Sequence, residues 1–499
     1  MKIPLMGGAY VSRSVIAEAQ RCLNLYPEAN PGDAEVPVTH YPTPGLVSLL
    51  QGPAASGWRG FFVASNGVLF GVLGTKVYKI KNDWTVQELG TLVTDVHTPV
   101  SMADNGATLM IVDGSTHGYL VDLSTLAFSE IADPDFRGGN FVQYLDSYFV
   151  LNEPGTNVWY SSLSNSTDFD GLYYAAKNGS PDPIQAIRVV HREAWLVGVN
   201  TTEVWNTVGG ASFPFAPLQG VFIQHGTAAK YSLAGWGLQL FWLSRDNNGQ
   251  AIVVTGESYR ARAISTPAIV SEFSKYATID DAIGMVYQQD SHVFYLLTFP
   301  TANKTWVYDA SIDQWHERCW LDDNGNENRH RVNCIAFAYG KVIGGDWQNG
   351  TIYELSLDAY SDAGKPIKRL RSFPHLVNEG ARIEYISFVA DMEVGTGGLV
   401  AGPDFMDDFG PDFGPSPVVE SDPMVTLRWS DTRGKSWGNG VLQSMGKTGE
   451  FLAFPTWRRL GYARDRVFEL SWSTKMKTAL NGAYLEVNVE PKARAKPRG

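Results

Sequence analysis

The chain has 499 residues, of which 44% are hydrophobic, 12% aromatic and 18% charged, and its formal net charge is −12. This acidic balance argues against a surface that grips nucleic acid, which needs clustered Lys and Arg, but it allows a channel through which DNA slides without binding. Three cysteines without a CxxC pair argue against a disulfide framework. No apolar run reaches the ~20 residues of a membrane span, and the N-terminus lacks the apolar stretch of a signal peptide.

Residues 1–56 are predicted to form an extended N-terminal segment. The stretch CLNLYPEANPGDAEVPVTHYPTPGL is rich in proline, which disfavours helix and central strands. We expect this segment to close a ring of sheets by adding a strand to the last one, or to pack elsewhere.

Residues 57–370 repeat one pattern at intervals of about 40 to 50 residues, the period typical of propeller blades. Each unit has a polar turn, a β-branched and aromatic run, a second turn and another apolar run. The aligned positions are Val77, Leu120, Val158, Val204, Val253, Val307 and Ile352. Earlier strand-like runs in each unit, joined by Gly, Asn and Asp turns, complete an antiparallel blade. The pattern predicts a roughly seven-bladed β-propeller; six blades or a distorted ring are the alternatives.

The stretch from Tyr295 to Arg318, YLLTFPTANKTWVYDASIDQWHER, illustrates one unit. It is predicted to be part of the sixth blade, with PTANKT and DASIDQ as turns. Its aromatic residues Trp306, Tyr308 and Trp315 are then packing residues, and His316 is expected to start a loop.

After residue 370 the period is lost, and residues 371–490 are predicted to form a small antiparallel β-sandwich or sheet. Longer alternating runs such as RIEYISFVADMEVG and DRVFELSWS are typical of its strands. The acidic Gly/Pro loop 402–417 contains an imperfect Gly-Pro-Asp-Phe repeat and is interpreted as a surface loop or a partner contact. Residues 491–499 form a basic tail, which we expect to be solvated.

No sequence motif requires an enzyme or a cofactor. The chain has no P-loop and no dinucleotide fingerprint. His316, Cys319, His330 and Cys334 have a spacing that superficially resembles a metal site. The long polar stretch between the two halves of this set favours ordinary loop residues, with Cys334 in a strand.

The stretch SDTRGKSW, from Ser430 to Trp437, is similar to the Asp-box turn of sialidases. That turn is a structural staple, and Thr432 stands here where an acid is usual. A sialidase would also need an arginine triad, a tyrosine nucleophile and several boxes, none of which can be placed. A carbohydrate-binding or glycosidase-type propeller is therefore the alternative function rather than the favoured one.

Three groups of motifs stand out. The first is the run LRWSDTRGKSWGNGVLQSMGKTGEFLAFPTWRRLGYARDRVF near the C-terminus. The others are RCLNLYPE with YPTPGL near the N-terminus, and WVYDASIDQWHER in the middle. Together they resemble the packaged-DNA stabilisation proteins, or tail accessory (tail hub) proteins, of short-tailed bacteriophages. The likeness spans essentially the whole chain, with departures at Thr432 and in the acidic stretch around Phe405 to Phe413.

The resemblance implies a structural protein of the virion tail, assembled in the host bacterial cytoplasm. Its subunits are expected to form a ring, as a homohexamer, below the portal and its adaptor, and to carry a needle, tailspike or fibres. DNA would pass through this hub or nozzle during ejection without specific recognition. The partner-contact candidates are Trp457, Arg458, Arg459, Arg464, Arg466, Phe405, Asp407, Asp408 and Phe413. The arginines are equally interpreted as ion pairs inside the C-terminal sheet.

Overall fold

The computed structural model describes residues 2–489 except 4, 6, 33, 95–97, 210–212, 396–399, 402–416, 419–421 and 448. The described chain consists almost entirely of short strands, with one α-helix, α1 (Pro267–Phe273). Contacts divide it into two compact units, which we call the propeller unit and the sandwich unit. The propeller unit contains residues 47–311 and 329–355, and the sandwich unit contains residues 1–46, 312–328 and 356–499.

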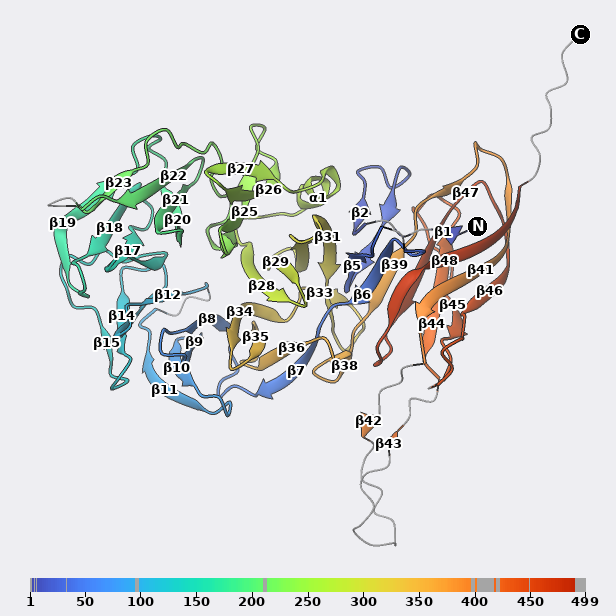
Figure 1. Cartoon of the computed structure of the whole chain (residues 1–499), viewed down its shortest axis with the longest axis horizontal. Helices are drawn as coiled ribbons and strands as arrows, with labels where there is room; N and C mark the ends of the chain where they lie inside the picture. Colours follow the sequence, from blue (N-terminus) through green and yellow to red (C-terminus); the bar gives the residue numbers. More distant parts are fainter. Residues whose placement is uncertain are drawn as a thin grey trace, which may run out of the picture. The chain divides into compact units, whose positions relative to one another are not determined.

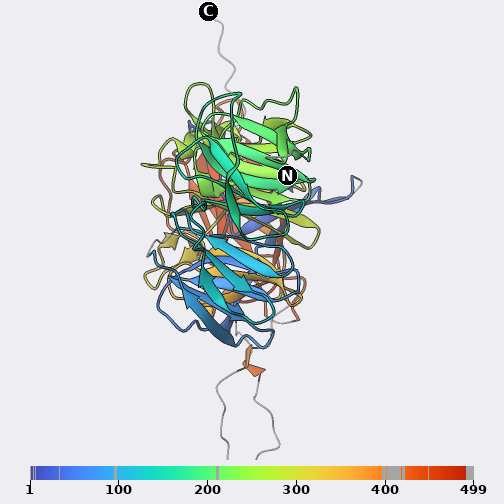
Figure 2. The same ribbon diagram turned by 90° about the vertical axis from the view of Figure 1, so that its left-hand side faces the viewer.

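The propeller unit is a ring of antiparallel sheets, seven in the described part of the chain, and Figures 1 and 2 show them as blades. The first blade is β8 (Trp58–Val63), β9 (Leu69–Leu73), β10 (Lys76–Ile80) and β11 (Val86–Thr91). The second is β12 (Ser101–Asp104), β13 (Thr108–Val112), β14 (Gly118–Asp122) and β15 (Phe128–Glu130). The third is β16 (Val142–Leu145), β17 (Tyr148–Asn152), β18 (Val158–Ser162) and β19 (Phe169–Ala176).

The remaining blades follow in chain order. The fourth is β20 (Ile184–Val190), β21 (Glu193–Gly198), β22 (Thr202–Thr207) and β23 (Phe215–Pro217). The fifth is β24 (Ala234–Trp236), β25 (Gln239–Arg245), β26 (Ala251–Glu257) and β27 (Arg260–Ala263). The sixth has β28 (Ile283–Gln289), β29 (His292–Phe299) and β30 (Lys304–Asp309) in this unit. The seventh is β34 (Val332–Ala338), β35 (Lys341–Asp346), β36 (Ile352–Ser356) and β7 (Gly45–Leu50).

The repeat read from the sequence corresponds to the third strand of each blade. The seven aligned positions lie in β10, β14, β18, β22, β26, β30 and β36. Their apolar side chains recur because each third strand packs between the faces of neighbouring blades. The predicted seven-bladed propeller is confirmed.

Tight hairpins explain how such short strands form blades. Several hairpins between the first two strands of a blade turn on two consecutive residues with positive φ, for example Asp146–Ser147, His191–Arg192 and Asp290–Ser291. Such turns match the right-handed twist of the paired strands, and small or polar residues tolerate the left-handed conformation better than β-branched ones.

The ring closes between the seventh blade and the first. Trp58 of β8 is fully buried in a cluster with Ile343 of β35 and Ile352 of β36, and its indole N–H donates to the carbonyl of Gly350 at 2.6 Å. Strand β7 from the N-terminal region forms the outer strand of that last blade. Just after it, the side chain of Gln51 accepts a hydrogen bond from Thr351 at 3.1 Å. Strand pairing across about 300 residues of sequence therefore joins the two ends of the ring.

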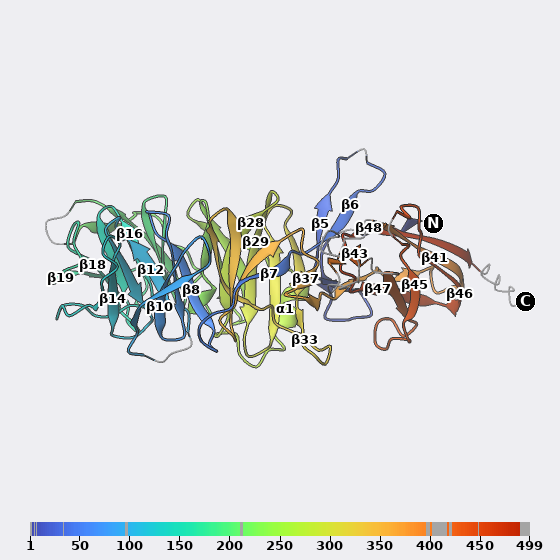
Figure 3. The same ribbon diagram turned by 90° about the horizontal axis from the view of Figure 1, so that it is seen from below.

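The sandwich unit has two sheets, and its C-terminal strands are drawn in orange and red (Figure 3). One sheet has the order β46-β41-β48-β6-β5, with β1 beside β48. The other runs β31-β4-β39-β47-β44-β45, with β40 beside β47. The bounds are β1 (Lys2–Ile3), β4 (Cys22–Leu23), β5 (Leu25–Ala29), β6 (Val38–Pro42), β31 (Gln314–Arg318), β39 (Arg369–Ser372), β40 (Leu376–Val377), β41 (Ile383–Glu393), β44 (Met424–Ser430), β45 (Val441–Ser444), β46 (Thr456–Ala463), β47 (Asp465–Trp472) and β48 (Ala479–Val489).

Aromatic packing fills the space between the two sheets. The ring of Phe388 on β41 lies 4.9 Å from that of Phe468 on β47 and 5.9 Å from that of Trp457 on β46. Tyr385 and Phe373 approach the same cluster edge-on. The predicted C-terminal β-sandwich is therefore present.

The remaining described elements are small. They are β2 (Tyr10–Val11) with β3 (Ala19–Gln20), β32 (Trp320–Leu321) with β33 (Glu327–Asn328), β37 (Ser361–Asp362) with β38 (Lys365–Pro366), β42 (Val400–Ala401) with β43 (Pro417–Val418), and the 3₁₀ turn η1 (Lys230–Ser232).

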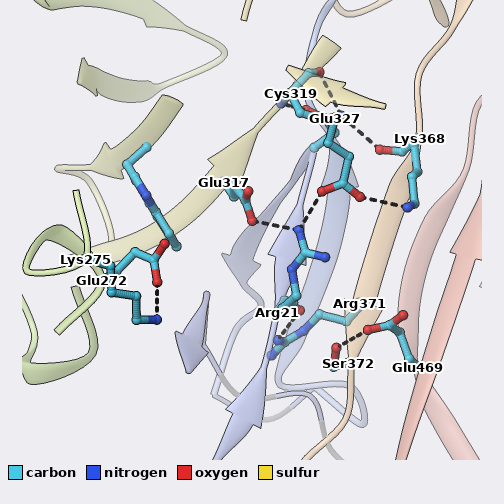
Figure 4. Close-up of polar contacts among 12 residues, drawn as sticks. Arg21, Glu272, Lys275, Glu317, Cys319, Glu327, Lys368, Arg371, Ser372 and Glu469 are labelled. Atoms are coloured by element: carbon cyan, nitrogen blue, oxygen red, sulfur yellow. Dashed lines mark hydrogen bonds and ion pairs between the residues drawn. The ribbon is translucent and has the colours of Figure 1, made fainter. Parts of the chain in front are cut away.

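The N-terminal residues also belong to the sandwich unit, which the sequence-based boundaries at 56 and 370 do not reflect. Strand β4 lies between β31 and β39 and pairs with both. Next to it, Arg21 donates hydrogen bonds to the carboxylates of Glu317 (2.9 Å) and Glu327 (3.0 Å), and Lys368 binds Glu327 at 2.7 Å (Figure 4). The expectation that His316 starts a loop is wrong, because this fully buried residue lies in the middle of β31.

Candidate functional site

Metal-ligand side chains are dispersed in the described part of the chain. No group of three or more His, Cys, Asp or Glu residues there is placed to hold a metal ion. Burial raises the pKa of Cys22 to about 11 and that of Cys319 to about 12. These thiols stay protonated at neutral pH, and the protonated form is neither a good nucleophile nor a good metal ligand.

The stretch similar to an Asp-box forms a hairpin turn after β44. The Ser430 hydroxyl accepts the backbone N–H of Gly434 at 2.9 Å, and the Thr432 hydroxyl accepts that of Ser436 at 2.8 Å. Hydrogen bonds to these two hydroxyl groups therefore stabilise the turn. The adjacent Asp431 instead binds Arg466 of β47. The arrangement is a local backbone staple.

Two of the predicted contact residues are buried inside the sandwich unit. Trp457 is 2% exposed, and its indole N–H donates to the carbonyl of Val441 at 2.8 Å. Arg466 is 1% exposed; its guanidinium binds both carboxylate oxygens of Asp431, at 2.5 and 2.9 Å, and lies 4.5 Å from the ring centre of Tyr385. A side chain enclosed in this way supports the sheet from within and presents no surface to another chain.

Three other predicted contact residues are exposed. Arg458 and Arg459 lie on β46, which is the edge strand of its sheet. Arg459 has φ of +61° and occupies a β-bulge, where the register of β46 against β41 shifts. Arg464, at the corner between β46 and β47, donates to the carbonyl of Gly380 at 2.5 Å. Charged side chains on an edge strand also oppose unwanted strand pairing, so exposure alone does not identify a partner contact.

The remaining predicted contact residues, Phe405, Asp407, Asp408 and Phe413, lie outside the described residues. Their role stays a prediction.

A surface that the sequence analysis did not identify lies between β45 and the start of β46. We call it the 441–454 surface; its large exposed apolar side chains are those of Val441 (42% exposed), Leu442 (58%), Phe451 (66%), Leu452 (85%) and Phe454 (52%). Val441 and Leu442 are neighbours on β45 and point to opposite faces of its sheet, so the loop residues Phe451, Leu452 and Phe454 are the main candidates for a contact. The sequence signal was the run EFLAFP, three large apolar residues enclosed by Gly and Pro.

The backbone under the 441–454 surface is held by specific contacts. Gly449 donates to the carbonyl of Gly395 at 3.0 Å, and Met445, which is fully buried, donates to that of Pro423 at 2.7 Å. The indole of Trp457 fixes the carbonyl of Val441 from inside the sheet. These hydrogen bonds tie described parts of the backbone near the apolar side chains to the rest of the sandwich unit. Strand β45 beside it is the edge of its sheet and pairs, in the described chain, with β44 alone.

Comparisons with known proteins match this fold. Residues 1–360 match the protein family described as "Bacteriophage P22 Gp10, beta-propeller". No curated protein sequence matches the chain. The described chain has no helix long and apolar enough to cross a membrane.

Similar solved structures are distant. One is the extracellular domain of a putative hybrid two-component system, BT4673, from B. thetaiotaomicron, with 10% identity, a TM-score of 0.41, and coverage of 62% of this chain and 40% of that one. Another is virginiamycin B lyase from Staphylococcus aureus, with 11% identity, a TM-score of 0.39, and coverage of 62% and 98%. The computationally designed Ika8 protein has 12% identity, a TM-score of 0.37, and coverage of 63% and 99%. At this similarity none of them carries an argument about function.

The family match covers well over half of the chain and includes both the N-terminal segment and the propeller. It confirms the resemblance stated from the sequence motifs. The protein belongs to the bacteriophage P22 Gp10 β-propeller family.

Proposed function

We propose that this protein is a structural component of a phage tail, forming a ring below the portal and its adaptor. In this position it closes the head–tail channel, retains packaged DNA and carries fibres or a needle. Family membership is the observation that carries the proposal. The 441–454 surface supports it, because exposed apolar side chains that lie together are typical of sites where proteins contact one another.

We assign the 441–454 surface to the contact between neighbouring copies of the chain. A stable interface buries about 800 Å² per partner, so apolar side chains on one short segment need further contacts around them. The unpaired edge of β45 offers backbone donors and acceptors beside the apolar side chains. A head-to-tail contact of this kind, in which one surface meets a different surface of the next copy, closes into a ring when the rotation between copies allows it.

The acidic balance of the chain suits a ring around a DNA path. A lumen lined with carboxylates repels phosphates and so prevents arrest of the moving DNA. Replacing lumen acids with their amides is expected to slow DNA ejection. A basic lumen in the assembled ring would contradict this part of the proposal.

The assembly test compares the oligomeric state of two variants with that of the wild type. Leu452→Asp places a charge on the most exposed side chain of the 441–454 surface and is expected to leave a folded monomer. Leu172→Asp is the matched control, because Leu172 on β19 is likewise highly exposed (73%) but belongs to the propeller unit. Masses would be measured by light scattering on the full chain, alone and with the purified head–tail adaptor.

We expect the wild type and Leu172→Asp to form a multimer, either alone or once the adaptor is added. Leu452→Asp should remain a monomer in both conditions. Equal assembly of all three proteins would show that the 441–454 surface is not the contact. A wild-type chain that stays monomeric even with the adaptor would contradict the ring itself. Release of reducing sugar from host polysaccharide by that monomer would favour the glycosidase alternative.

A further inference from the structure

The inner strands of the blades enclose two cavities of about 600 and 250 Å³ along the axis of the propeller unit. Six residues line both cavities and so mark the level at which the cavities meet: Phe61, Val100, Phe141, Arg188, Leu233 and Ile335. Five of them are apolar. Arg188, on β20, is the charged one, and it stands at the junction of the two cavities.

The guanidinium of Arg188 has no hydrogen bond or ion pair with any other residue in the described part of the chain. Burial lowers the pKa of Arg188, which means that the surroundings disfavour its charge. Arg188 is partly exposed and lines both cavities, so its guanidinium is accessible from them to an anionic ligand.

The other charged side chains that line the cavities are already bound. Asp104, in the larger cavity, accepts hydrogen bonds from the backbone N–H (2.9 Å) and the hydroxyl (2.5 Å) of Ser65. Arg59, in the smaller one, donates to the carbonyls of Thr98 (2.7 Å) and Gly74 (3.1 Å). Asp104 is therefore held by Ser65, and Arg59, itself a cation, offers no counter-charge to Arg188.

We propose that the axial cavity of the propeller binds an organic anion, a carboxylate or phosphate ester with an aromatic or apolar body, through Arg188. A planar guanidinium binds both kinds of anion with two parallel hydrogen bonds. The aromatic side chains of Phe62, Tyr144 and Phe337 line the larger cavity and would contact the body of the ligand. Its volume is in the range that encloses a small organic ligand. This inference does not depend on ring assembly.

The test measures binding to the full-length chain by calorimetry at constant ionic strength, with phenyl phosphate, phenol and inorganic phosphate as ligands. Phenyl phosphate is expected to bind most tightly and phenol not at all. Arg188→Met should raise the Kd for phenyl phosphate by at least about tenfold, the effect of losing one charge-assisted contact. Arg260→Gln, which removes one exposed positive charge from β27 of the same unit, should leave the Kd unchanged.

A second variant keeps the proposal testable if Arg188→Met does not fold. Phe337 is 69% exposed, so Phe337→Ala should fold normally and still weaken the binding of phenyl phosphate more than that of inorganic phosphate. An acidic peptide, acetyl-Phe-Asp-Phe-amide, distinguishes the two sources of the anion. Tighter binding of this peptide than of phenyl phosphate would indicate an acidic side chain of a partner protein, and the reverse a free small molecule. Equal affinity of the wild type and Arg188→Met for every ligand would overturn the proposal.

Discussion

A buried ion pair between the third and fourth blades gives the sharpest prediction about stability. Lys177 is fully buried, and its ammonium group donates to the carbonyl of Ser180 (3.0 Å), the hydroxyl of Thr201 (2.6 Å) and the carboxylate of Asp182. Asp182 also accepts the backbone N–H groups of Asn200 (2.7 Å) and Thr201 (3.2 Å). Each of the three ammonium protons therefore has an acceptor.

Lys177→Met removes the cation and leaves the Asp182 carboxylate buried without a counter-charge. Breaking a buried pair in this way costs about 3–5 kcal/mol. The exposed pair between Lys76 and Glu88, with both side chains 44% exposed, is the matched control. Lys76→Met should change the free energy of unfolding by less than about 1 kcal/mol, because water solvates and screens that pair.

The assay is native-state hydrogen exchange of the backbone amides that bind Asp182, together with urea unfolding of the full chain. In Lys177→Met the amides of Asn200 and Thr201 should exchange faster, while amides of the first blade should not. The double variant with Asp182→Asn should recover part of the loss, since it removes the unpaired charge. Equal effects of Lys177→Met and Lys76→Met would refute the assignment of a buried, energetically coupled pair.

The same pair predicts a loss of stability in acid. Burial alone would raise the pKa of Asp182, but hydrogen bonds from Lys177 and the neighbouring backbone outweigh it and hold the pKa at about 2. Because the folded-state pKa lies below the ordinary value, the pair contributes fully above about pH 4, and its contribution is lost as the pH falls towards 2. The shift corresponds to about 2–3 kcal/mol. Unfolding measured from pH 6 to pH 2 should show this loss in the wild type; an acid profile of Lys177→Met/Asp182→Asn identical to it would contradict the prediction.

Three further changes test other parts of the fold. Gly52→Ala should loosen the ring closure, because its Cβ would lie 2.2 Å from the carbonyl oxygen of Gly350, whereas Gly32→Ala meets nothing within 4 Å and should be neutral; protease resistance of the propeller measures both. Asp431→Asn should destabilise the sandwich unit by about 1–2 kcal/mol, since it removes the counter-charge of the buried Arg466 but water reaches the 45% exposed Asp431 side chain, as measured by thermal unfolding. Thiol labelling at pH 8 should leave the buried Cys22 and Cys319 of the native protein unmodified, and unfolding should expose both.

The strands and the propeller could be predicted from the sequence because they depend on local patterns. The two runs read as C-terminal strands coincide with β41 and β47, and the aligned apolar positions fall in the third strands of the blades. The composition of the sandwich unit could not be predicted in the same way. Lys2 of β1 pairs with Tyr484 of β48, and no local pattern connects residues so far apart in the sequence.

The local sequence pattern also could not predict which arginines of WRRLGYARDR are exposed and which is buried. Strict alternation from the buried Trp457 would turn Arg459 inward and Leu460 outward. The bulge at Arg459 inserts one extra residue, so that Arg459 is exposed and Leu460 is 6% exposed. Arg466 is buried because its guanidinium pairs with Asp431, which follows β44, and packs against the ring of Tyr385 on β41. Neither partner lies on the strand of Arg466 itself. Side-chain exposure here follows from the register between strands, which a single sequence does not reveal.

The division of the N-terminal segment between the two units has a consequence for the order of assembly. Blades one to five consist of strands that are consecutive in sequence, so each can form as soon as it is synthesised. The seventh blade needs β7 from the N-terminus and β34 to β36 from far downstream, so the ring closes only after about 350 residues are available. The sandwich unit needs both β1 and β48, and the 441–454 surface belongs to this unit. In the proposed ring, a contact surface that forms last would keep incomplete chains from joining, because its apolar side chains would reach their final arrangement only in a finished subunit.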